Sequence, residues 1–155
     1  MLGAGKSGLG ASLLAKKNGA NVLVSDSSPI SNYCKTLFDN SEILWEQNGH
    51  SEKKILSADL IIKSPGIPDS NKLIKKIEKK GIPIISEIEY AGRFCSGKKI
   101  CVTGSNGKTT TTLMIENILN NAGLSTKAVG NIGESFALSV ATNPVDYYVI
   151  ELSSF

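Results

Sequence analysis

The feature that most constrains this chain is its alternation of short apolar segments with longer amphipathic ones. The short segments have the length and composition of buried strands, and the longer ones repeat apolar residues at helical spacing. Parallel strands need a crossover helix between them, so this order predicts an α/β fold with parallel sheets. We expect strands at residues 21–25, 42–45, 59–63, 83–85, 99–103, 125–129 and 146–152, and helices at 9–18, 71–80, 87–94, 109–122 and 134–141.

The helix expected at residues 109–122 has an unusual first turn. Ile115, Ile118, Leu119 and Ala122 share one face of this helix at the i, i+3, i+4, i+7 spacing. Residues 109–112 are all threonine, and each costs about 0.5–0.7 kcal/mol relative to alanine in a helix. Folding alone would not choose such a run. We therefore expect these hydroxyls, or the start of this helix, to serve a function.

Composition places the chain among soluble globular proteins. Its 155 residues suffice for one large domain or two small ones, with 41% hydrophobic and 20% charged residues. The net charge is +3 and the lysines are scattered along the sequence, so we expect an ordinary solvated surface and no nucleic-acid partner. No apolar run reaches the roughly 20 residues of a bilayer-spanning helix, and we expect no membrane association.

The cysteine and histidine content argues against several kinds of site. Cys34, Cys95 and Cys101 are odd in number and lack the spacing of metal or redox motifs, as is typical of reduced thiols in a cytoplasmic protein. The single histidine, His50, lies in a polar stretch. We therefore expect neither a catalytic triad nor a histidine metal cage.

A glycine-containing loop follows the strand expected at residues 99–103. Glycines permit positive φ, so successive N–H groups can point into one concave site, and a helix N-terminus adds donors and partial positive charge. Such a loop between a strand and a helix binds the phosphates of ATP, with its lysine on the outer phosphates and its threonine hydroxyl on Mg²⁺. Val102 stands where the usual pattern has its first glycine, and the alternative is a purely structural turn. The loop residues are Gly104, Ser105, Asn106, Gly107, Lys108, Thr109 and Thr110.

Glu151 ends the apolar run of the last expected strand. A neighbouring parallel strand brings its carboxylate to the sheet edge where Lys108 lies. Mg²⁺ takes one or two carboxylates besides phosphate oxygens, so we predict that Thr109 and Glu151 are metal ligands. The hydroxyls of Ser153 and Ser154 favour a functional edge; the alternative is a solvated strand end.

Another glycine loop opens the chain. Residues 3–8 read Gly-Ala-Gly-Lys-Ser-Gly before the first helix, and the next strand leads to Asp26. This is the G-x-G-x-x-G arrangement of dinucleotide-binding folds, with an acid about where it contacts a ribose. We expect the loop to hold a diphosphate. The pattern leaves the base open, and residues 5–7 can alternatively be read as the tail of a second ATP loop.

Two further turns follow strands at the edge where open α/β sheets bind ligands. The sequence Ser64-Pro65-Gly66-Ile67-Pro68 either lines a ligand site or forms a rigid surface turn. In Gly-Asn-Ile-Gly at residues 130–133, Asn131 either offers its amide to a ligand or caps the following helix.

The strand–helix pattern restarts after residues 95–98, so we place a domain boundary near Ser96. Residues 1–95 then form a Rossmann-like domain, and residues 96–155 begin a P-loop α/β domain. We expect both sheets to be incomplete, because only Met1 and Leu2 precede the first glycine loop and the chain stops directly after a strand. The expectation is therefore a fragment of a longer protein.

Five motifs in this order resemble the Mur ligases, most closely the members that add D-glutamate. They span nearly the whole chain, and together they are far more specific than any one of them. The resemblance implies an ATP-dependent acid–amino-acid ligase of cytoplasmic peptidoglycan precursor synthesis, monomeric as the longer protein. The motifs lie at residues 3–8, 64–68, 103–109, 130–133 and 151–155.

The resemblance also implies residue roles. Residues 104–110 would hold ATP, with Lys108 at the γ-phosphate and Thr109 and Glu151 at Mg²⁺. The first domain would hold the UDP end of the substrate. The residues implied for UDP-substrate binding are Lys6, Ser7, Asp26, Ser27, Ser64, Pro65, Gly66 and Asn131.

The implied reaction joins D-glutamate to UDP-N-acetylmuramoyl-L-alanine. The γ-phosphate of ATP passes to the L-alanyl carboxylate, and the D-glutamate amine then displaces phosphate from this acyl phosphate. Positioning and cation clamping dominate such chemistry. The D-glutamate contacts and the family's second metal site would lie outside these 155 residues, so we expect no turnover by this chain.

Other functions are consistent with parts of the sequence. An NAD-dependent dehydrogenase would use the first glycine loop and Asp26, but it leaves residues 104–110 without a purpose. A folylpolyglutamate-type ligase or another Mur-type ligase shares the ATP loop, although the former does not explain the residues before Ser96. A nucleotide-binding protein without enzymatic activity is the last alternative.

Overall fold

The computed structural model describes residues 1–153 and has the expected α/β fold with parallel strands. Ser154 and Phe155, from the last of the five motifs, lie outside the described residues. All the expected strands and helices are present, with ends within three residues of those expected. The elements are α1 (Lys6–Lys17), β1 (Leu23–Ser25), α2 (Asn32–Asn40), β2 (Leu44–Glu46), α3 (Glu52–Ile55), β3 (Ile61–Lys63), α4 (Lys72–Lys79), β4 (Ile84–Ser86), α5 (Glu87–Phe94), β5 (Lys98–Val102), α6 (Lys108–Asn121), β6 (Thr126–Gly130), α7 (Phe136–Thr142) and β7 (Tyr147–Glu151).

Two of these helices, α2 and α3, were not expected from the sequence. Phe38 is the one fully buried residue of α2, so the helix has no apolar stripe that a periodicity search would find. It begins where the Ser31 side chain accepts a hydrogen bond from the N–H of Cys34 at 3.2 Å. Helix α3 is a single turn, which is too short to show helical spacing.

The first half of the chain forms a parallel sheet in the order β2-β1-Leu2-β3-β4. β1 pairs with β2 and β3 with β4, and Leu2 bridges Ser25 on one side and Lys63 on the other. Leu2 therefore holds the central position where a strand was expected before the first glycine loop. The chain passes from this position into α1, so the loop lies at the carboxyl edge of the sheet.

The second half forms a parallel sheet in the order β5-β7-β6. Strand β7 is central and its last four residues are buried, as expected for a strand covered on both faces. The register places Val102 of β5 and Gly130 of β6 on either side of Glu151. The loops that follow all three strands therefore begin around this one carboxylate.

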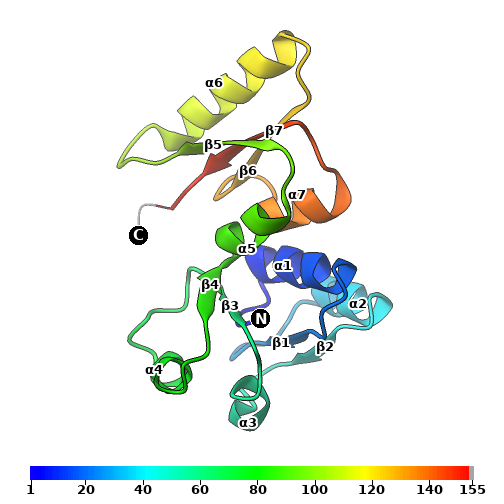
Figure 1. Cartoon of the computed structure of the whole chain (residues 1–155), viewed down its shortest axis with the longest axis vertical. Coiled ribbons are helices and arrows are strands. Elements are labelled where there is room, and N and C mark those ends of the chain that lie inside the picture. The colour runs from blue at the N-terminus through cyan, green and yellow to red at the C-terminus, as the bar shows by residue number, and fades with distance from the viewer. Residues whose placement is uncertain (154–155) are drawn as a thin grey trace.

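Helices fill the space between the two sheets and cover their outer sides (Figure 1). α1, α5 and α7 lie between the sheets, and α6 lies on the outer side of the second sheet. On the outer side of the first sheet, Ile74 and Ile77 of α4 and Ile55 of α3 pack against Leu2 and Ile61.

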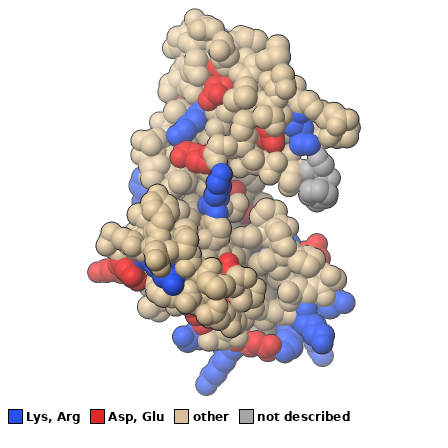
Figure 2. Space-filling model, turned by 180° about the vertical axis from the view of Figure 1, so that it is seen from behind, with Lys and Arg blue, Asp and Glu red and all other residues tan. Residues whose placement is uncertain are grey.

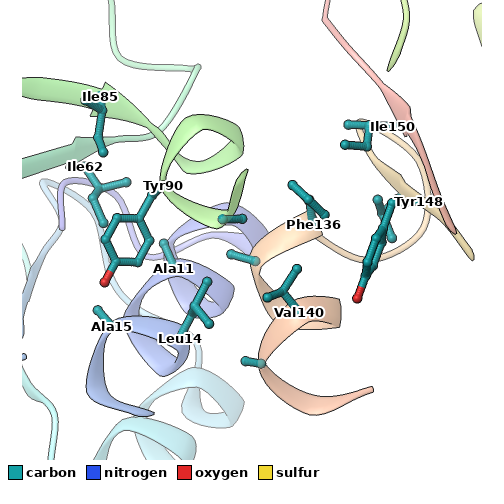
Figure 3. Close-up of a cluster of buried hydrophobic side chains, with 14 residues drawn as sticks. Ala11, Leu14, Ala15, Ile62, Ile85, Tyr90, Phe136, Val140, Tyr148 and Ile150 are labelled. Atoms are coloured by element: carbon teal, nitrogen blue, oxygen red, sulfur yellow. The ribbon is translucent and has the colours of Figure 1, made fainter. Parts of the chain in front are cut away.

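One apolar core joins the two halves of the chain (Figure 3). It contains Leu14 of α1 and Tyr90 of α5 together with Phe136 of α7 and Tyr148 of β7. The rings of Phe136 and Tyr148 meet edge to face, with centroids 5.0 Å apart. The boundary predicted near Ser96 falls between α5 and β5, and the division into two domains there stays a prediction.

The contact between α1 and α7 is close because Gly10 has no side chain. A Cβ atom at Gly10 would lie 2.1 Å from Ser135 Oγ and 2.6 Å from the backbone nitrogen of Leu138. Beside this contact, the N–H of Ala137 donates to Glu87 Oε1 at 2.5 Å. Glu87 begins α5 and is only 4% exposed, so a carboxyl group from the first half is buried against the second.

The apolar face of α6 is only partly covered. Ile115 and Leu119 are half-buried, whereas Ile118 is 63% exposed and Ala122 is exposed as well. The fully buried residue of α6 is Thr112. Helical spacing identifies a face correctly but cannot show how much of it a neighbouring element covers.

Basic side chains are less scattered than the sequence led us to expect. Figure 2 shows them gathered at the end of the molecule that the first half forms. Exposed ion pairs such as Lys76–Glu52, at 2.6 Å, add little stability. The exposed lysines on and beside α3 and α4 are Lys53, Lys54, Lys72, Lys75, Lys76, Lys79 and Lys80.

Among residues 1–153, no helix combines the length and apolar character that spanning a membrane requires.

Replacing Gly10 with alanine should destabilise the protein by about 1–3 kcal/mol, because the added methyl group would overlap Ser135 and the backbone of Leu138. Gly92 of α5 is the matched control, since no described atom lies within 4 Å of a Cβ placed there. Gly92→Ala should be neutral or stabilise by up to about 1 kcal/mol. Urea unfolding measures both, and equal stability of the two variants would contradict the close contact.

Glu87 should make stability depend on pH. Burial raises its pKa from 4.5 to about 7, although the N–H of Ala137 lowers it. The folded protein therefore holds this proton more tightly than the unfolded chain, so the free energy of unfolding falls as pH rises from about 4.5 to 7. Between pH 5 and pH 8, the free energy of unfolding should fall by about 2–3 kcal/mol less in Glu87→Gln than in the unmodified chain. Urea unfolding at several pH values tests this prediction, with Glu89→Gln as the exposed control on the same helix. The prediction is refuted if the unfolding free energy of Glu87→Gln depends on pH as strongly as that of the unmodified chain.

Candidate functional site

The carboxylate of Glu151 lies at the centre of the candidate site. It is only 3% exposed, and each of its oxygens accepts a hydrogen bond from a different loop. Thr109 Oγ1 donates to Oε2 at 2.7 Å, and Asn131 Nδ2 donates to Oε1 at 3.0 Å. The predicted metal pair, Thr109 and Glu151, is thus in direct contact, and Asn131 joins it.

The loop between β5 and α6 has the backbone geometry that was expected of a phosphate loop. Gly107 lies immediately before α6 with φ of 74°, in the left-handed region that other residues avoid. The first N–H groups of α6 therefore follow a tight glycine turn. Lys108 Nζ donates to the carbonyl oxygen of Gly104 at 2.7 Å, so the ammonium group lies against its own loop.

The run of threonines at the start of α6 has more than one role. Thr109 contacts Glu151 through its hydroxyl, although Thr109, Thr110 and Thr111 are all largely exposed. Thr112 is fully buried, and no hydrogen-bond partner is found for its Oγ1 among the described residues. The expectation that these hydroxyls do more than form a helix is therefore supported for Thr109.

The donor set around Glu151 fits a hard cation that also binds phosphate. The Glu151 carboxylate and the Thr109 hydroxyl are oxygen ligands of the kind that Mg²⁺ accepts alongside phosphate and water. Within residues 1–153, no group of three or more histidine, cysteine, aspartate or glutamate side chains could hold a metal ion. A cation here would take phosphate or water oxygens besides these side chains.

The loop that carries Asn131 is fixed against β7. Gly130 has φ of 101°, and a Cβ there would lie 2.5 Å from the carbonyl oxygen of Glu151. The N–H of Asn131 donates to that same carbonyl oxygen at 3.0 Å. Asn131 thus holds both the backbone and the side chain of Glu151, and the sequence's alternative of a helix cap is wrong, because Ser135 caps α7.

The first glycine loop is held by the acid that the sequence singled out. Asp26 Oδ2 accepts a hydrogen bond from the N–H of Ala4 at 2.7 Å, and Oδ1 accepts one from the N–H of Ser28 at 2.9 Å. Asp26 therefore ties this loop to the end of β1. Lys6 reaches the other half of the chain, where its Nζ donates to the carbonyl oxygen of Gly133 at 3.4 Å.

The Ser64 turn lies directly beside the first glycine loop. The N–H of Ser64 donates to the carbonyl oxygen of Leu2 at 3.0 Å. A Cβ on Gly3 would meet Ser64 Oγ at 2.5 Å. Two segments predicted to bind the same ligand are thus neighbours at one sheet edge.

A cleft of about 770 Å³ lies between the two halves. It brings Ser7 of the first loop and Pro65 of the Ser64 turn to the same space as Asn131 and Glu151. The other predicted site residues are not among its lining residues: Lys6, Asp26, Ser27, Ser64, Gly66 and residues 104–110. The predicted residues are therefore arranged around a shared cleft rather than all within it.

Two features near the site were missed by sequence reasoning. Glu87 also lines the cleft, but a glutamate at the start of a helix gives no sign of burial. Ser25 Oγ lies 2.6 Å from His50 Nδ1 and donates to Glu46 Oε1 at 2.7 Å. Burial alone would raise the pKa of Glu46, but hydrogen bonds from Ser51 and Ser25, with the nearby charge of Lys54, lower it overall.

Comparison with known families matches both halves of the chain. Residues 1–86 match the Mur ligase MurD-like N-terminal domain, and residues 102–155 match the Mur ligase middle domain.

Several similar curated proteins are named UDP-N-acetylmuramoylalanine–D-glutamate ligase. Those of Bacteroides fragilis and Bacteroides thetaiotaomicron are 56% and 54% identical over 155 residues, which is all of this chain and 35% of each relative. That of Porphyromonas gingivalis is 50% identical over all of this chain and 34% of the relative. The chain thus spans about a third of the length of these relatives.

Solved structures agree on the fold. A pseudomurein peptide ligase type C from Methanothermus fervidus is 28% identical with a TM-score of 0.56, covering 97% of this chain and 31% of that one. A UDP-N-acetylmuramate–alanine ligase from Thermotoga maritima, 23% identical with a TM-score of 0.58, covers 97% of this chain and 36% of that one.

Proposed function

This chain belongs to the Mur ligase family, and on that premise we propose that it carries the ATP site and the UDP-substrate site of a ligase that adds D-glutamate to UDP-N-acetylmuramoyl-L-alanine. The observation that carries the proposal is the contact of Thr109 and Asn131 with the buried Glu151 carboxylate. This contact joins the ATP loop to the cleft between the two halves. The names of relatives that are 50–56% identical over the whole chain support the choice of D-glutamate.

ATP would bind at the loop between β5 and α6. The backbone N–H groups of residues 104–110 would surround its phosphates, and Lys108 would turn from Gly104 to the γ-phosphate. Thr109 and Glu151 would hold Mg²⁺ together with phosphate oxygens. The metal supplies positive charge that neutralises the phosphoryl oxygens during transfer.

The UDP end of the other substrate would lie on the first half. Lys6 and Ser7 would contact its diphosphate at the N-terminus of α1. Asp26 and Ser27 follow β1 and would lie near the uridine, with Ser64, Pro65 and Gly66 forming the neighbouring wall. Asn131 would approach the L-alanyl end, since it lines the cleft between the halves.

The reaction requires that the γ-phosphate of ATP and the L-alanyl end of the other substrate be brought together. A carboxylate oxygen of the L-alanyl group attacks the γ-phosphorus, and the bond to ADP breaks. The D-glutamate amine then attacks the acyl carbon, loses a proton and expels phosphate to give the amide. Glu151, Lys108 and Asn131 hold and neutralise groups in this scheme and need not transfer a proton.

The proposed ligase acts in the cytoplasm on precursors of the cell wall. We expect its full-length form to be a monomer. No residue of this chain is assigned to D-glutamate, so release of ADP that depends on D-glutamate is not expected from the 155 residues. The dehydrogenase alternative loses its support, because both halves of the chain match Mur ligase families.

Replacing Lys108 with alanine should weaken ATP binding by roughly tenfold or more, because a charge-assisted contact to phosphate is lost. The measurement is calorimetric titration of this chain with ATP in excess Mg²⁺. Lys99→Ala is the control: its ammonium lies near the carbonyl oxygen of Cys95, at the opposite end of β5. Equal ATP affinity in the two variants would refute the assignment of this loop.

A further inference from the structure

We propose that Glu87 and Lys17 are positioning residues that hold the two ends of helix α7 and thereby fix the Asn131 loop beside Glu151. Both side chains come from the first half of the chain, whereas α7 and the loop belong to the second. The inference rests on the proposed function only for what the site binds; the contacts that carry it are independent of any ligand.

Glu87 holds the start of α7. Ala137 is the second residue of that helix, and its N–H is one of those in the first turn that have no partner within the helix. This N–H donates to Glu87 Oε1 at 2.5 Å. Ser135 satisfies a different donor, the N–H of Leu138, at 3.2 Å, so the two acceptors serve adjacent positions from opposite sides of the junction.

Lys17 holds the other end of the same helix. It is the last residue of α1, and its Nζ donates to the carbonyl oxygen of Ala141 at 2.6 Å. Carbonyl groups in the last turn of a helix also lack partners within it. A hydrogen-bond acceptor thus lies at the amino end of α7 and a donor at its carboxyl end, so both ends of the helix receive partners from the first half.

Residues 130–134 connect α7 to the site. Gly133, shortly before the helix, accepts the hydrogen bond from Lys6. The N–H of Gly130 donates to the carbonyl oxygen of Glu134 at 3.1 Å, which closes the loop onto the segment leading to α7. Asn131 lies inside that closed loop, so displacement of α7 would move its amide away from Glu151.

The choice of a carboxyl group at position 87 argues for positioning rather than for stability alone. Buried ionisable groups carry a desolvation cost, and apolar side chains of similar size often stabilise such a place better. A hydrogen bond, in contrast, fixes one register and one rotation of α7 against α5. Gly10 adds a steric limit on the other side, since α1 approaches the same turn of α7.

The experiment follows amide hydrogen exchange by NMR in the 155-residue chain. The variants are Glu87→Ala, which removes the acceptor, Glu87→Gln, which keeps an acceptor oxygen, and Lys17→Ala, which frees the opposite end. Two matched controls are Glu89→Ala and Lys16→Ala, whose side chains pair with Arg93 and Glu42 within the first half. The probes are the backbone amides of Asn131 and Ala137 and the side-chain amide signals of Asn131.

Glu87→Ala and Lys17→Ala should each speed exchange at Asn131 and Ala137 by about tenfold or more, without a comparable change in α6. The Asn131 side-chain signals should shift in both variants. Glu87→Gln should restore protection close to the original level, and neither control should change it. The proposal is overturned if Glu87→Ala and Lys17→Ala leave the Asn131 signals and exchange unchanged, or if the controls alter them equally.

A parallel titration with ATP and Mg²⁺ separates this inference from the proposed function. If the variants loosen the Asn131 loop while the unmodified chain binds no ATP, positioning by Glu87 and Lys17 stands and the ATP assignment fails. If the unmodified chain binds ATP but the loop is unaffected by Glu87→Ala and Lys17→Ala, the positioning role fails and the ATP assignment stands.

Discussion

The burial of one carboxylate at the end of a central strand is the constraint on which this site depends. Glu151 is almost inaccessible, and the oxygens of a buried carboxyl group need hydrogen-bond partners. Thr109 and Asn131 supply them from the loops on either side. The parallel register brings these loops together, because the carboxyl ends of β5, β6 and β7 meet at one edge.

The junction between the halves extends that constraint to the rest of the molecule. Helix α7 packs against α1 and α5 in a shared apolar core, so the sheet that carries Glu151 cannot shift freely against the sheet that carries the first glycine loop. A substrate that reaches from one loop to the other needs such a fixed distance, since misplacement of reacting groups is costly in rate. The cleft lies where the two halves face each other.

Much of this architecture could be predicted from the sequence, and the failures have physical causes. Glycine spacing and strand–helix order identified both loops and the pairing of Thr109 with Glu151, since these follow from local backbone rules. Helices α2 and α3 were missed because they bury too few residues to show a period. The exposure of Ile118 and the burial of Glu87 depend on which elements become neighbours, and local patterns do not contain that information.

Binding of Mn²⁺ in the presence of ATP, followed by electron paramagnetic resonance, tests the central claim most directly, because Mn²⁺ takes the oxygen ligands that Mg²⁺ prefers. The Glu151→Gln variant keeps the size of the side chain but removes its charge and one of its two acceptor oxygens. We predict that Mn²⁺ bound with ATP is held roughly tenfold or more weakly by the variant, since the charged ligand is lost. Equal Mn²⁺ affinity in both proteins would contradict the account.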